Sequence, residues 1–190
     1  MACSAIDKDV VIENAAMEPE ISDLCYFLSK IGVSFEGIGT STLTVKGIVH
    51  KNPIDIKYSV IPDRIEAGTF LIACAMTGGE ICLNNVNPSH LNEVLSNLST
   101  SGSIVEVSKQ SIIIKSNKKI NSVDLITDVY PGFPTDLQAQ WIALMTIANG
   151  KSVIKDTVYL DRFTHVPELI RLGANIRMDK NIAIIEGVKS

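Results

Sequence analysis

Three segments of the chain carry apolar residues three and four positions apart, which is typical of a helix with one buried face. The apolar positions are Ile21, Leu24, Cys25 and Leu28 in the first segment, Leu91, Val94, Leu95 and Leu98 in the second, and Val166, Leu169 and Ile170 in the third. A glycine that can end a helix in the left-handed conformation follows each segment: Gly32, Gly102 and Gly173. Pro19 and Pro88 stand near the starts of the first two, where a missing amide hydrogen costs nothing. The pattern predicts three helices.

Two short runs that are typical of strands follow each predicted helix. After the first helix they are "VSFEGI" and "STLTVKG", and after the second they are "SIVEVS" and "SIIIKS". Such pairs, separated by short polar turns, predict β-hairpins. Gly37 and Gly39 fall in the first turn, and because a strand rather than a helix follows them, they are not expected to bind phosphate.

The three closing glycines are 70 and then 71 residues apart, so the chain contains an internal repeat. One more predicted helix precedes the second and third copies, in "PDRIEAGTFLIACAMTGG" and "PTDLQAQWIALMTIANG". Both helices begin with a capping signature, because Asp63 is followed three residues later by Glu66 and Thr135 is followed by Gln138.

Strands predicted at "IDIKYSV" and "SVDLIT" complete a repeated βαβαββ unit. We therefore expect two complete repeats, at residues 53–116 and 121–188, preceded by the last portion of a third. The expected fold class is α/β (α+β). An incomplete repeat leaves an apolar face uncovered, so the chain is expected either to be a piece of a longer protein or to associate with itself or with a complementary chain.

Composition narrows the functional class. Hydrophobic side chains make up 46% of the 190 residues, which is enough for one sizeable core or two small ones. The formal net charge is −4 and the basic residues are dispersed, which argues against nucleic-acid binding. Neither a signal peptide nor an apolar run of membrane-spanning length is present, so we expect a cytoplasmic protein without membrane contact.

Four cysteines are scattered along the chain, without a CxxC pair or a histidine at ligand spacing. They are Cys3, Cys25, Cys74 and Cys82. This spacing predicts neither a zinc site nor a disulfide framework, and we expect no bound metal. Buried, reduced thiols are the expected state of these residues.

Four motifs closely resemble the UDP-N-acetylglucosamine enolpyruvyl transferases, in the right order and with matching intervals over essentially the whole chain. They are "ENAAMEPEISDL", "IPDRIEAGTF", "PGFPTDLQAQ" and "DRFTHVPEL". The resemblance implies transfer of the enolpyruvyl group from phosphoenolpyruvate to the 3-hydroxyl of UDP-N-acetylglucosamine with release of phosphate. This is the first committed step of peptidoglycan synthesis, and it needs no cofactor. The implied fold is an inside-out α/β barrel, with helices inside two similar domains of three βαβαββ units each.

By the same resemblance, residues 1–60 correspond to the end of the first domain and residues 61–190 to two units of the second. The family's mobile catalytic loop, its arginines for phosphoenolpyruvate, its nucleotide-binding serine loop and its DLRA-type motif have no counterpart in this chain. None of the four cysteines matches the reactive one of the family. Because catalysis in the family needs two domains to close over both substrates, we expect the isolated chain to be inactive.

The resemblance implies a site role for three residues. Asp136, in the first turn of a predicted helix where the helix dipole favours negative charge, is expected to contact the sugar nucleotide and to act as the base for its hydroxyl. Val158 is expected to contact the sugar nucleotide through its backbone, and Arg162 to lie near the closed active site. Without the resemblance, Asp136 is better explained as a favourable charge at a helix start and Arg162 as a solvated loop charge. This chain has "LDRF" where the family commonly has "ENRF", which leaves the hydrogen bonds around Arg162 open.

Other polar residues of these motifs have simpler structural explanations. We expect a structural role for His165, a capping role for Gln138, a surface amide at Gln140 and a core position for Trp141. For Arg64, an ion pair with Asp63 or Glu66 is at least as good an explanation as a substrate role.

Three other hypotheses remain open at this point. One is the related transferase that acts on shikimate 3-phosphate, against which "PGFPTDLQAQ" argues. Another is a non-catalytic sugar-nucleotide-binding or interaction module built from the same repeats. The last is a poorly folded product of a truncated gene, against which cooperative thermal unfolding would argue.

Overall fold

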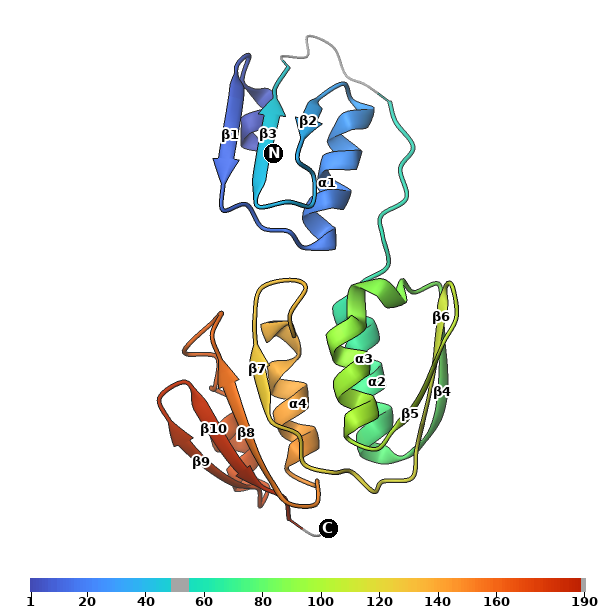
Figure 1. Ribbon diagram of the computed structural model, residues 1–190, viewed down its shortest axis with the longest axis vertical. Helices are drawn as coiled ribbons and strands as arrows, with labels where there is room; N and C mark the ends of the chain where they lie inside the picture. Colours follow the sequence, from blue (N-terminus) through green and yellow to red (C-terminus); the bar gives the residue numbers. More distant parts are fainter. Residues whose placement is uncertain (49–54, 189–190) are drawn as a thin grey trace. The chain divides into compact units, whose positions relative to one another are not determined.

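The computed structural model describes residues 1–48 and 55–188. The chain divides into two compact lobes, an N-terminal lobe of Met1–Ile61 and a C-terminal lobe of Pro62–Ser190 (Figure 1). Each lobe has a hydrophobic core of its own. The assignment of residues 1–60 and 61–190 to the first and second domains of a transferase stays a prediction. No helix in the described part of the chain is long and apolar enough to cross a membrane.

The N-terminal lobe is one helix packed against a three-stranded antiparallel sheet. Its elements are η1 (Ala2–Ala5), β1 (Asp9–Glu13), α1 (Pro19–Lys30), β2 (Ser34–Glu36) and β3 (Thr42–Lys46). The strands pair in the order β1-β3-β2. The core is small, and its buried residues are Cys25, Leu28, Val33, Leu43 and Val45. The predicted helix and hairpin are confirmed, with Gly37 and Gly39 in the turn between β2 and β3.

The strand predicted at residues 54–60 is wrong for its described part, since residues 55–61 form no regular element. Ile54 lies outside the described residues. The Tyr58 hydroxyl donates hydrogen bonds to Asp23 on α1, to its carboxylate at 2.7 Å and its carbonyl at 3.1 Å, and the ring packs edge-on against Phe27. The bond to Asp23, together with burial, raises the pKa of Tyr58 to about 12. These contacts hold the segment against a helix instead of beside a strand.

The first half of the C-terminal lobe holds two helices and a three-stranded sheet. The elements are α2 (Arg64–Thr77), β4 (Gly79–Asn84), η2 (Pro88–Leu91), α3 (Asn92–Thr100), β5 (Ile104–Val107) and β6 (Ser111–Ser116). The strands pair antiparallel in the order β4-β6-β5. Asp63 caps α2, as predicted, because its carboxylate accepts hydrogen bonds from the amides of Ile65 and Glu66. In the described residues this repeat lacks its opening strand, so the expectation of a complete unit here is not met.

The second half of the C-terminal lobe is a complete βαβαββ repeat. Its elements are β7 (Leu125–Thr127), η3 (Thr135–Leu137), α4 (Gln138–Met145), β8 (Lys151–Asp156), α5 (Val166–Arg171), β9 (Asn175–Asp179) and β10 (Ile182–Glu186). The strands pair in the order β7-β8-β10-β9, with β7 parallel to β8 and the other pairs antiparallel. The prediction of a complete repeat at 121–188 is confirmed.

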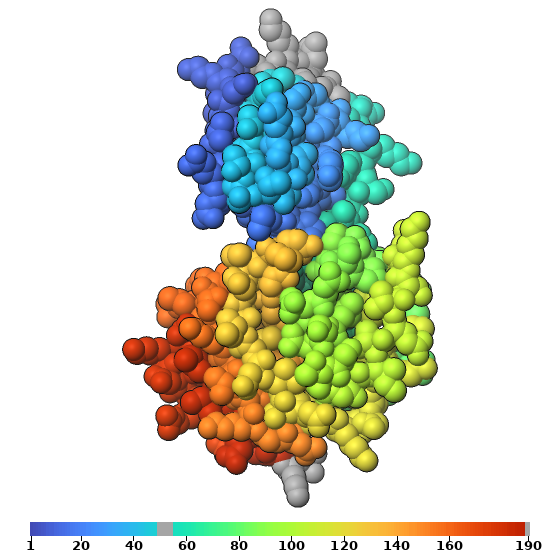
Figure 2. Space-filling model, in the orientation of Figure 1, coloured from blue at the N-terminus to red at the C-terminus, as the bar shows by residue number. Residues whose placement is uncertain are grey.

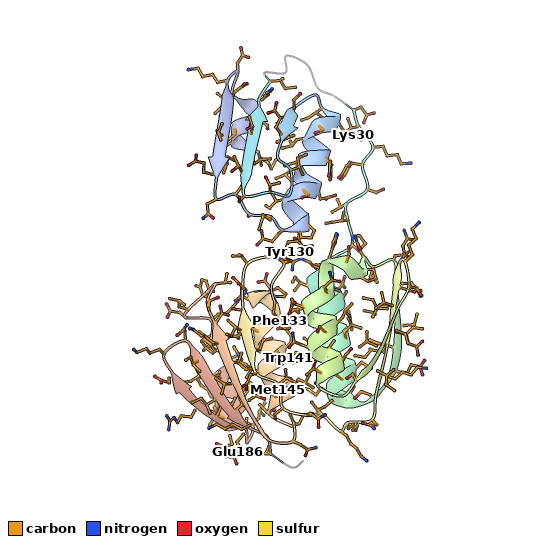
Figure 3. The ribbon with its side chains drawn as sticks, in the orientation of Figure 1. Lys30, Tyr130, Phe133, Trp141, Met145 and Glu186 are labelled. Atoms are coloured by element: carbon orange, nitrogen blue, oxygen red, sulfur yellow. The ribbon has the colours of Figure 1, made fainter. Side chains whose placement is uncertain are left out.

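Helices α2 and α4 form the interior of the C-terminal lobe. Helices α2 and α4 pack against each other, α2 also packs on β6, and α4 also packs on β8 and β10, so the helices lie between the two sheets (Figure 1). Side chains fill the space that the ribbon leaves open (Figure 2). Phe133 and Trp141 meet edge to face at 5.5 Å between ring centroids, close to Met145 (Figure 3). Trp141 is fully buried, as predicted.

Gly68 allows α2 and α4 to approach closely. A Cβ atom at this position would overlap the side chain of Leu137, which is itself fully buried. The absence of a side chain at Gly68 therefore allows α2 to lie close to Leu137, the last residue of η3, directly before α4.

Two detailed expectations differ from the structure. Ile170, predicted on a buried helix face, is 45% exposed, because α5 has only six residues and only its other side packs on the sheet. Cys82, expected to be buried, is exposed on β4, whereas Cys25 and Cys74 are buried, and burial raises the pKa of both their thiols.

Candidate active site

The candidate site lies where strand β8 ends and the loop 157–163 begins. Along β8 the side chains of Ser152, Ile154 and Asp156 are buried and alternate with more exposed ones. Because successive side chains of a strand point to opposite faces, this register turns Asp156 inward. Asp156 is fully buried, which is rare for a carboxylate and requires hydrogen-bond partners.

The Asp156 carboxylate accepts four hydrogen bonds from three segments. The Thr127 hydroxyl at the end of β7 donates to Oδ1 at 2.8 Å, as do the amides of Val158 at 2.9 Å and Tyr159 at 2.8 Å. The Thr135 hydroxyl, in η3, donates to Oδ2 at 2.7 Å. The carboxylate thus joins β7, η3 and the loop after β8.

These hydrogen bonds outweigh the cost of burying the charge. Burial by itself raises the pKa of Asp156, but the bonds from Thr135, Tyr159, Thr127 and Val158 act in the other direction. The net effect holds the pKa of this carboxyl below its ordinary value. Hydrogen bonds to a charged group contribute about 1.5–3 kcal/mol each, so four of them can exceed the desolvation of one carboxylate. Asp156 is therefore ionised at neutral pH.

The predicted capping role of Thr135 is wrong. The cap position belongs to Pro134, and no side chain caps η3 or α4. The Thr135 hydroxyl bonds to the buried Asp156 carboxylate instead, which is the stronger partner because it is charged. Gln138, the expected capping partner, is fully buried, and its amide group has no partner among the described residues.

Asp136 and Arg162 lie together at this site. The Arg162 guanidinium donates from Nη1 to Asp136 Oδ1 at 2.6 Å, and the two side chains are 40% and 49% exposed respectively. The same Nη1 lies 3.4 Å from the Thr135 hydroxyl oxygen, and the guanidinium carbon lies 5.9 Å from the centre of the Tyr159 ring. A carboxylate and a guanidinium, both open to solvent, thus face the same space.

Val158 lies at the start of the same loop, with its side chain 42% exposed. Its backbone amide is already donated to Asp156, and in the described part of the chain no donor contacts its carbonyl oxygen. A ligand that meets the backbone at Val158 would therefore find an acceptor and no donor.

His165 and Arg64 have surroundings that fit structural roles. His165 is half buried, which lowers the pKa of its imidazole, and its ring stacks on Phe163 with 6.5 Å between centroids. The Arg64 guanidinium lies 5.6 Å from the centre of the Tyr130 ring. The predicted ion pair of Arg64 with Asp63 or Glu66 stays a prediction.

Gln140 is partly exposed and donates to the Thr69 hydroxyl at 3.1 Å, so it links α4 to α2.

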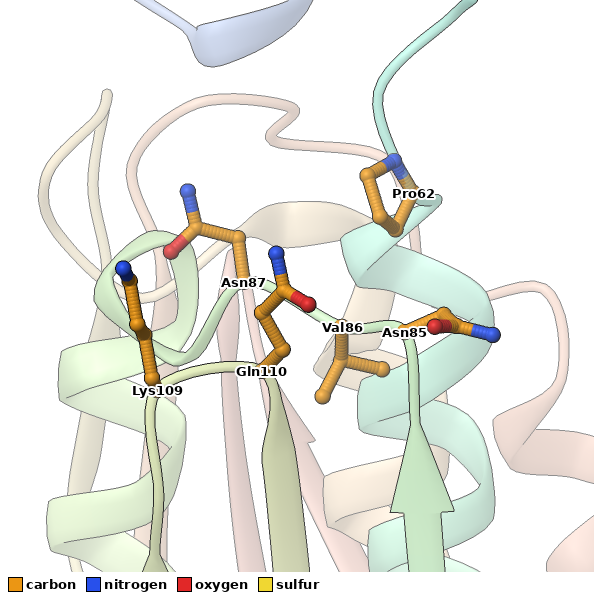
Figure 4. A pocket seen from close by; sticks show the side chains of 6 residues that line it. All are labelled: Pro62, Asn85, Val86, Asn87, Lys109 and Gln110. Carbon is orange, nitrogen blue, oxygen red and sulfur yellow. The ribbon is translucent and has the colours of Figure 1, made fainter.

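A separate pocket of about 510 Å³ lies in the first half of the same lobe, at the end of β4. Asn87, Lys109 and Gln110 line it together with Pro62, Asn85 and Val86 (Figure 4). The side-chain oxygen Oδ1 of Asn87 already accepts hydrogen bonds from the Ser89 amide and hydroxyl. No residue predicted for the site lies in this pocket. Among the described residues, no group of three or more His, Cys, Asp or Glu side chains could hold a metal ion.

Sequence reasoning missed Asp156 and Thr127. One signal could have found Asp156: buried and more exposed side chains alternate along β8, and this alternation places Asp156 on the same buried face as Ile154. Its two hydroxyl partners, Thr127 and Thr135, come from positions 29 and 21 residues earlier, and no local pattern connects them to Asp156.

Comparison with known proteins places these residues in a family. The family described as EPSP synthase (3-phosphoshikimate 1-carboxyvinyltransferase) matches residues 1–190. The chain is 47% identical over 188 residues to UDP-N-acetylglucosamine 1-carboxyvinyltransferase 1 of Caldanaerobacter subterraneus subsp. tengcongensis, covering 99% of this chain and 45% of that protein. It is 48% identical over 187 residues to the UDP-N-acetylglucosamine 1-carboxyvinyltransferase of Pelodictyon phaeoclathratiforme, covering 98% of this chain and 44% of that protein.

Solved structures agree on the fold. The enolpyruvyl transferase NikO from Streptomyces tendae superposes with a TM-score of 0.81 at 21% identity, covering 97% of this chain and 44% of NikO. EPSP synthase from Acinetobacter baumannii superposes with a TM-score of 0.51 at 12% identity. The expected enolpyruvyl transferase fold is thereby confirmed. The chain spans about half the length of the relatives it matches, at 45% and 44% of the two named above. With its whole length matched, the chain belongs to the EPSP synthase family of enolpyruvyl transferases.

Proposed function

We propose that this chain carries part of the active site of a UDP-N-acetylglucosamine 1-carboxyvinyltransferase. The reaction would move the enolpyruvyl group of phosphoenolpyruvate to the 3-hydroxyl of UDP-N-acetylglucosamine and release phosphate, as the first committed step of peptidoglycan synthesis in the cytoplasm. The observation that carries the proposal is the 2.6 Å contact between Asp136 and Arg162. The buried Asp156 carboxylate bonds to Thr135, the residue before Asp136, and to the amide of Val158. The high identity to relatives that bear this name supports the choice of substrates.

In this proposal Asp136 is the base. Its Oδ1 accepts the Arg162 hydrogen bond, and its half-exposed carboxylate leaves Oδ2 to accept a proton from a sugar hydroxyl. The Arg162 guanidinium has further donors with which it can bind an anionic oxygen of a substrate. The Val158 carbonyl can accept one hydrogen bond from the sugar nucleotide.

The isolated chain is expected to bind the sugar nucleotide but not to catalyse enolpyruvyl transfer. In enolpyruvyl transfer, groups that hold phosphoenolpyruvate and protonate its methylene carbon must meet the sugar hydroxyl in a site closed to water. The three proposed site residues serve only the sugar-nucleotide side. The share of the relatives that the chain covers, 44–45% in the two named above, favours a sugar-nucleotide-binding fragment as the second candidate. The shikimate 3-phosphate transferase is a lesser candidate, supported here by the description of the matching family and by the fold.

Two measurements on the purified chain test the proposal. Phosphate release is measured after mixing the chain with phosphoenolpyruvate and UDP-N-acetylglucosamine. Binding is measured by a two-dimensional ¹H–¹⁵N NMR titration with UDP-N-acetylglucosamine and, separately, with UDP. The variants are Asp136→Asn and, as a matched control, Asp128→Asn. The Asp128 carboxylate is exposed, and within residues 1–48 and 55–188 its one hydrogen bond is to the amide of Val129.

We expect no phosphate release, and saturable shifts of the Val158 and Arg162 signals on addition of the sugar nucleotide. Asp136→Asn should weaken binding of UDP-N-acetylglucosamine and leave binding of UDP unchanged, because the proposed contact is to the sugar. Asp128→Asn should change neither. Release of phosphate would show that the chain completes an active site, alone or by self-association. Absence of shifts at these residues would overturn the proposed site.

A further inference from the structure

The buried carboxylate of Asp156 has no contact with solvent, so it cannot itself touch a substrate. It nevertheless holds both segments that carry the proposed site residues, and it ties them to β7. Through Thr135 it holds the short helix that carries Asp136, and through the Val158 and Tyr159 amides it holds the loop that leads to Arg162. Its Thr127 bond anchors the group to β7, and the Thr157 amide in turn donates to the Thr127 hydroxyl oxygen at 3.2 Å.

The other repeat of the C-terminal lobe has no counterpart of this carboxylate. Counting back 71 residues, Asp156 corresponds to Asn85 and Thr135 to Arg64, whereas Thr127 falls at Ile56, in a segment that forms no strand. Asn85 is exposed, has a positive φ of 56° and lines the open pocket at the end of β4. The corresponding connection after β4 thus has neither a buried acid nor either threonine, and its backbone at Asn85 is left-handed, unlike that at Asp156. The network around Asp156 is particular to the repeat that carries the site.

The direction of the hydrogen bonds explains how Asp156 acts on the exposed pair. An ionised carboxylate only accepts, so the Thr135 hydroxyl must donate its proton to Asp156. The lone pairs of that hydroxyl therefore face outward, where Arg162 Nη1 lies 3.4 Å away. The same Nη1 donates to Asp136, one residue after Thr135. A continuous path runs from the buried charge to both exposed groups.

We propose that Asp156 is a positioning residue of the sugar-nucleotide site, which orients Asp136 and Arg162 through the Thr135 hydroxyl and the 158–159 backbone. The proposal rests on the proposed function, since the ligand is the sugar nucleotide named there. It predicts that binding depends on a carboxylate that the ligand never touches.

The test compares Asp156→Asn with Ile154→Ala, a change at the preceding inward position of the same strand. The Ile154 change removes core packing but no hydrogen bond of the network. For both variants the Kd for UDP-N-acetylglucosamine is measured by NMR titration well below the unfolding temperature, together with amide hydrogen exchange. We expect Asp156→Asn to raise the Kd about tenfold, as for one lost charge-assisted hydrogen bond, and to speed exchange at Val158 and Tyr159. Ile154→Ala should lower the unfolding temperature and leave the Kd unchanged.

Thr135→Val and Thr135→Ser provide a second pair, which remains informative if Asp156→Asn does not fold. The valine keeps the shape but removes the hydroxyl link, and the serine restores it. We expect the valine to weaken binding and the serine to retain it.

The outcomes separate this proposal from the function on which it rests. If the unaltered chain does not bind the sugar nucleotide, the proposed function fails. If it binds, and Asp156→Asn and Thr135→Val bind equally well, only the positioning role of Asp156 is overturned. Equal loss of affinity in Ile154→Ala would also overturn it, because general destabilisation would then explain the effect.

Discussion

Because the Asp156 carboxylate is hydrogen-bonded in its ionised form, the C-terminal lobe is expected to lose stability when acid protonates it. Its pKa is held below the ordinary value of 3.8, so the folded chain binds this proton less readily than the unfolded chain does. The stabilisation is therefore fully present above that value and is lost as pH falls through the lower, folded-state pKa. We expect Asp156→Asn to be less stable than the unaltered chain at neutral pH, by about 1–3 kcal/mol, and the difference to shrink in acid.

Urea unfolding of both proteins between about pH 3 and pH 7, followed by tryptophan fluorescence, measures this difference directly. His165 also has a lowered pKa, but it is present in both proteins and cancels in the comparison. A difference in unfolding free energy that stays constant down to the lowest pH would contradict the assigned ionisation of Asp156.

The sequence predicts some residues of the candidate site correctly and assigns others to the wrong partner. Asp136 and Arg162 were predicted for one site, and the structure brings their side chains within 2.6 Å, although their roles toward a ligand remain predictions. Thr135 was assigned to a helix cap because the local spacing fits a capping box. The hydroxyl bonds to Asp156 instead, and a carboxylate that arrives from another strand leaves no trace in the local pattern.

Among the elements, the contact between α2 and α4 depends on a missing side chain. We expect Gly68→Ala to destabilise the C-terminal lobe by about 1 kcal/mol, because the gain in helix propensity is smaller than the cost of overpacking against Leu137. Leu137 cannot move aside freely, since it is fully buried. The measurement is the free energy of unfolding in urea.

A double-mutant cycle provides the control for this prediction. In a Leu137→Ala background the added methyl group has room, so Gly68→Ala should become stabilising through helix propensity. If Gly68→Ala has the same effect in both backgrounds, the close approach of the two helices at Gly68 is not what limits this position.

The elements also differ in how well the sequence predicts them. Helices with a regular apolar face, such as α3, were predicted correctly, because burial of that face depends on their own spacing. The alternation in 54–60 predicts a strand, yet a strand exists only if a neighbouring strand pairs with it. In the described residues 55–60 that pairing is absent, and Tyr58 bonds to Asp23 on α1 instead. Partner choice of this kind is a tertiary property that the pattern of a single segment does not contain.

For the whole molecule, the 71-residue period predicted the repeated architecture but not the separation into two hydrophobic cores. The large cluster of buried residues lies entirely within 62–190, and the small one lies within 1–61. A lobe of 61 residues that buries so few apolar side chains has little to offset its conformational entropy. The two lobes should therefore differ in stability.

We expect the chain to unfold in two steps, with the N-terminal lobe first. The single tryptophan, Trp141, is buried in the C-terminal core, so its fluorescence follows that lobe alone, whereas far-ultraviolet circular dichroism follows the helices of both. In urea, the circular dichroism signal should begin to fall before the fluorescence changes. A chain of residues 62–190 should keep the fluorescence midpoint and lose the early phase. Coincident curves for the full chain, or a lower fluorescence midpoint for the shortened one, would mean that the lobes stabilise each other and fold as one cooperative unit.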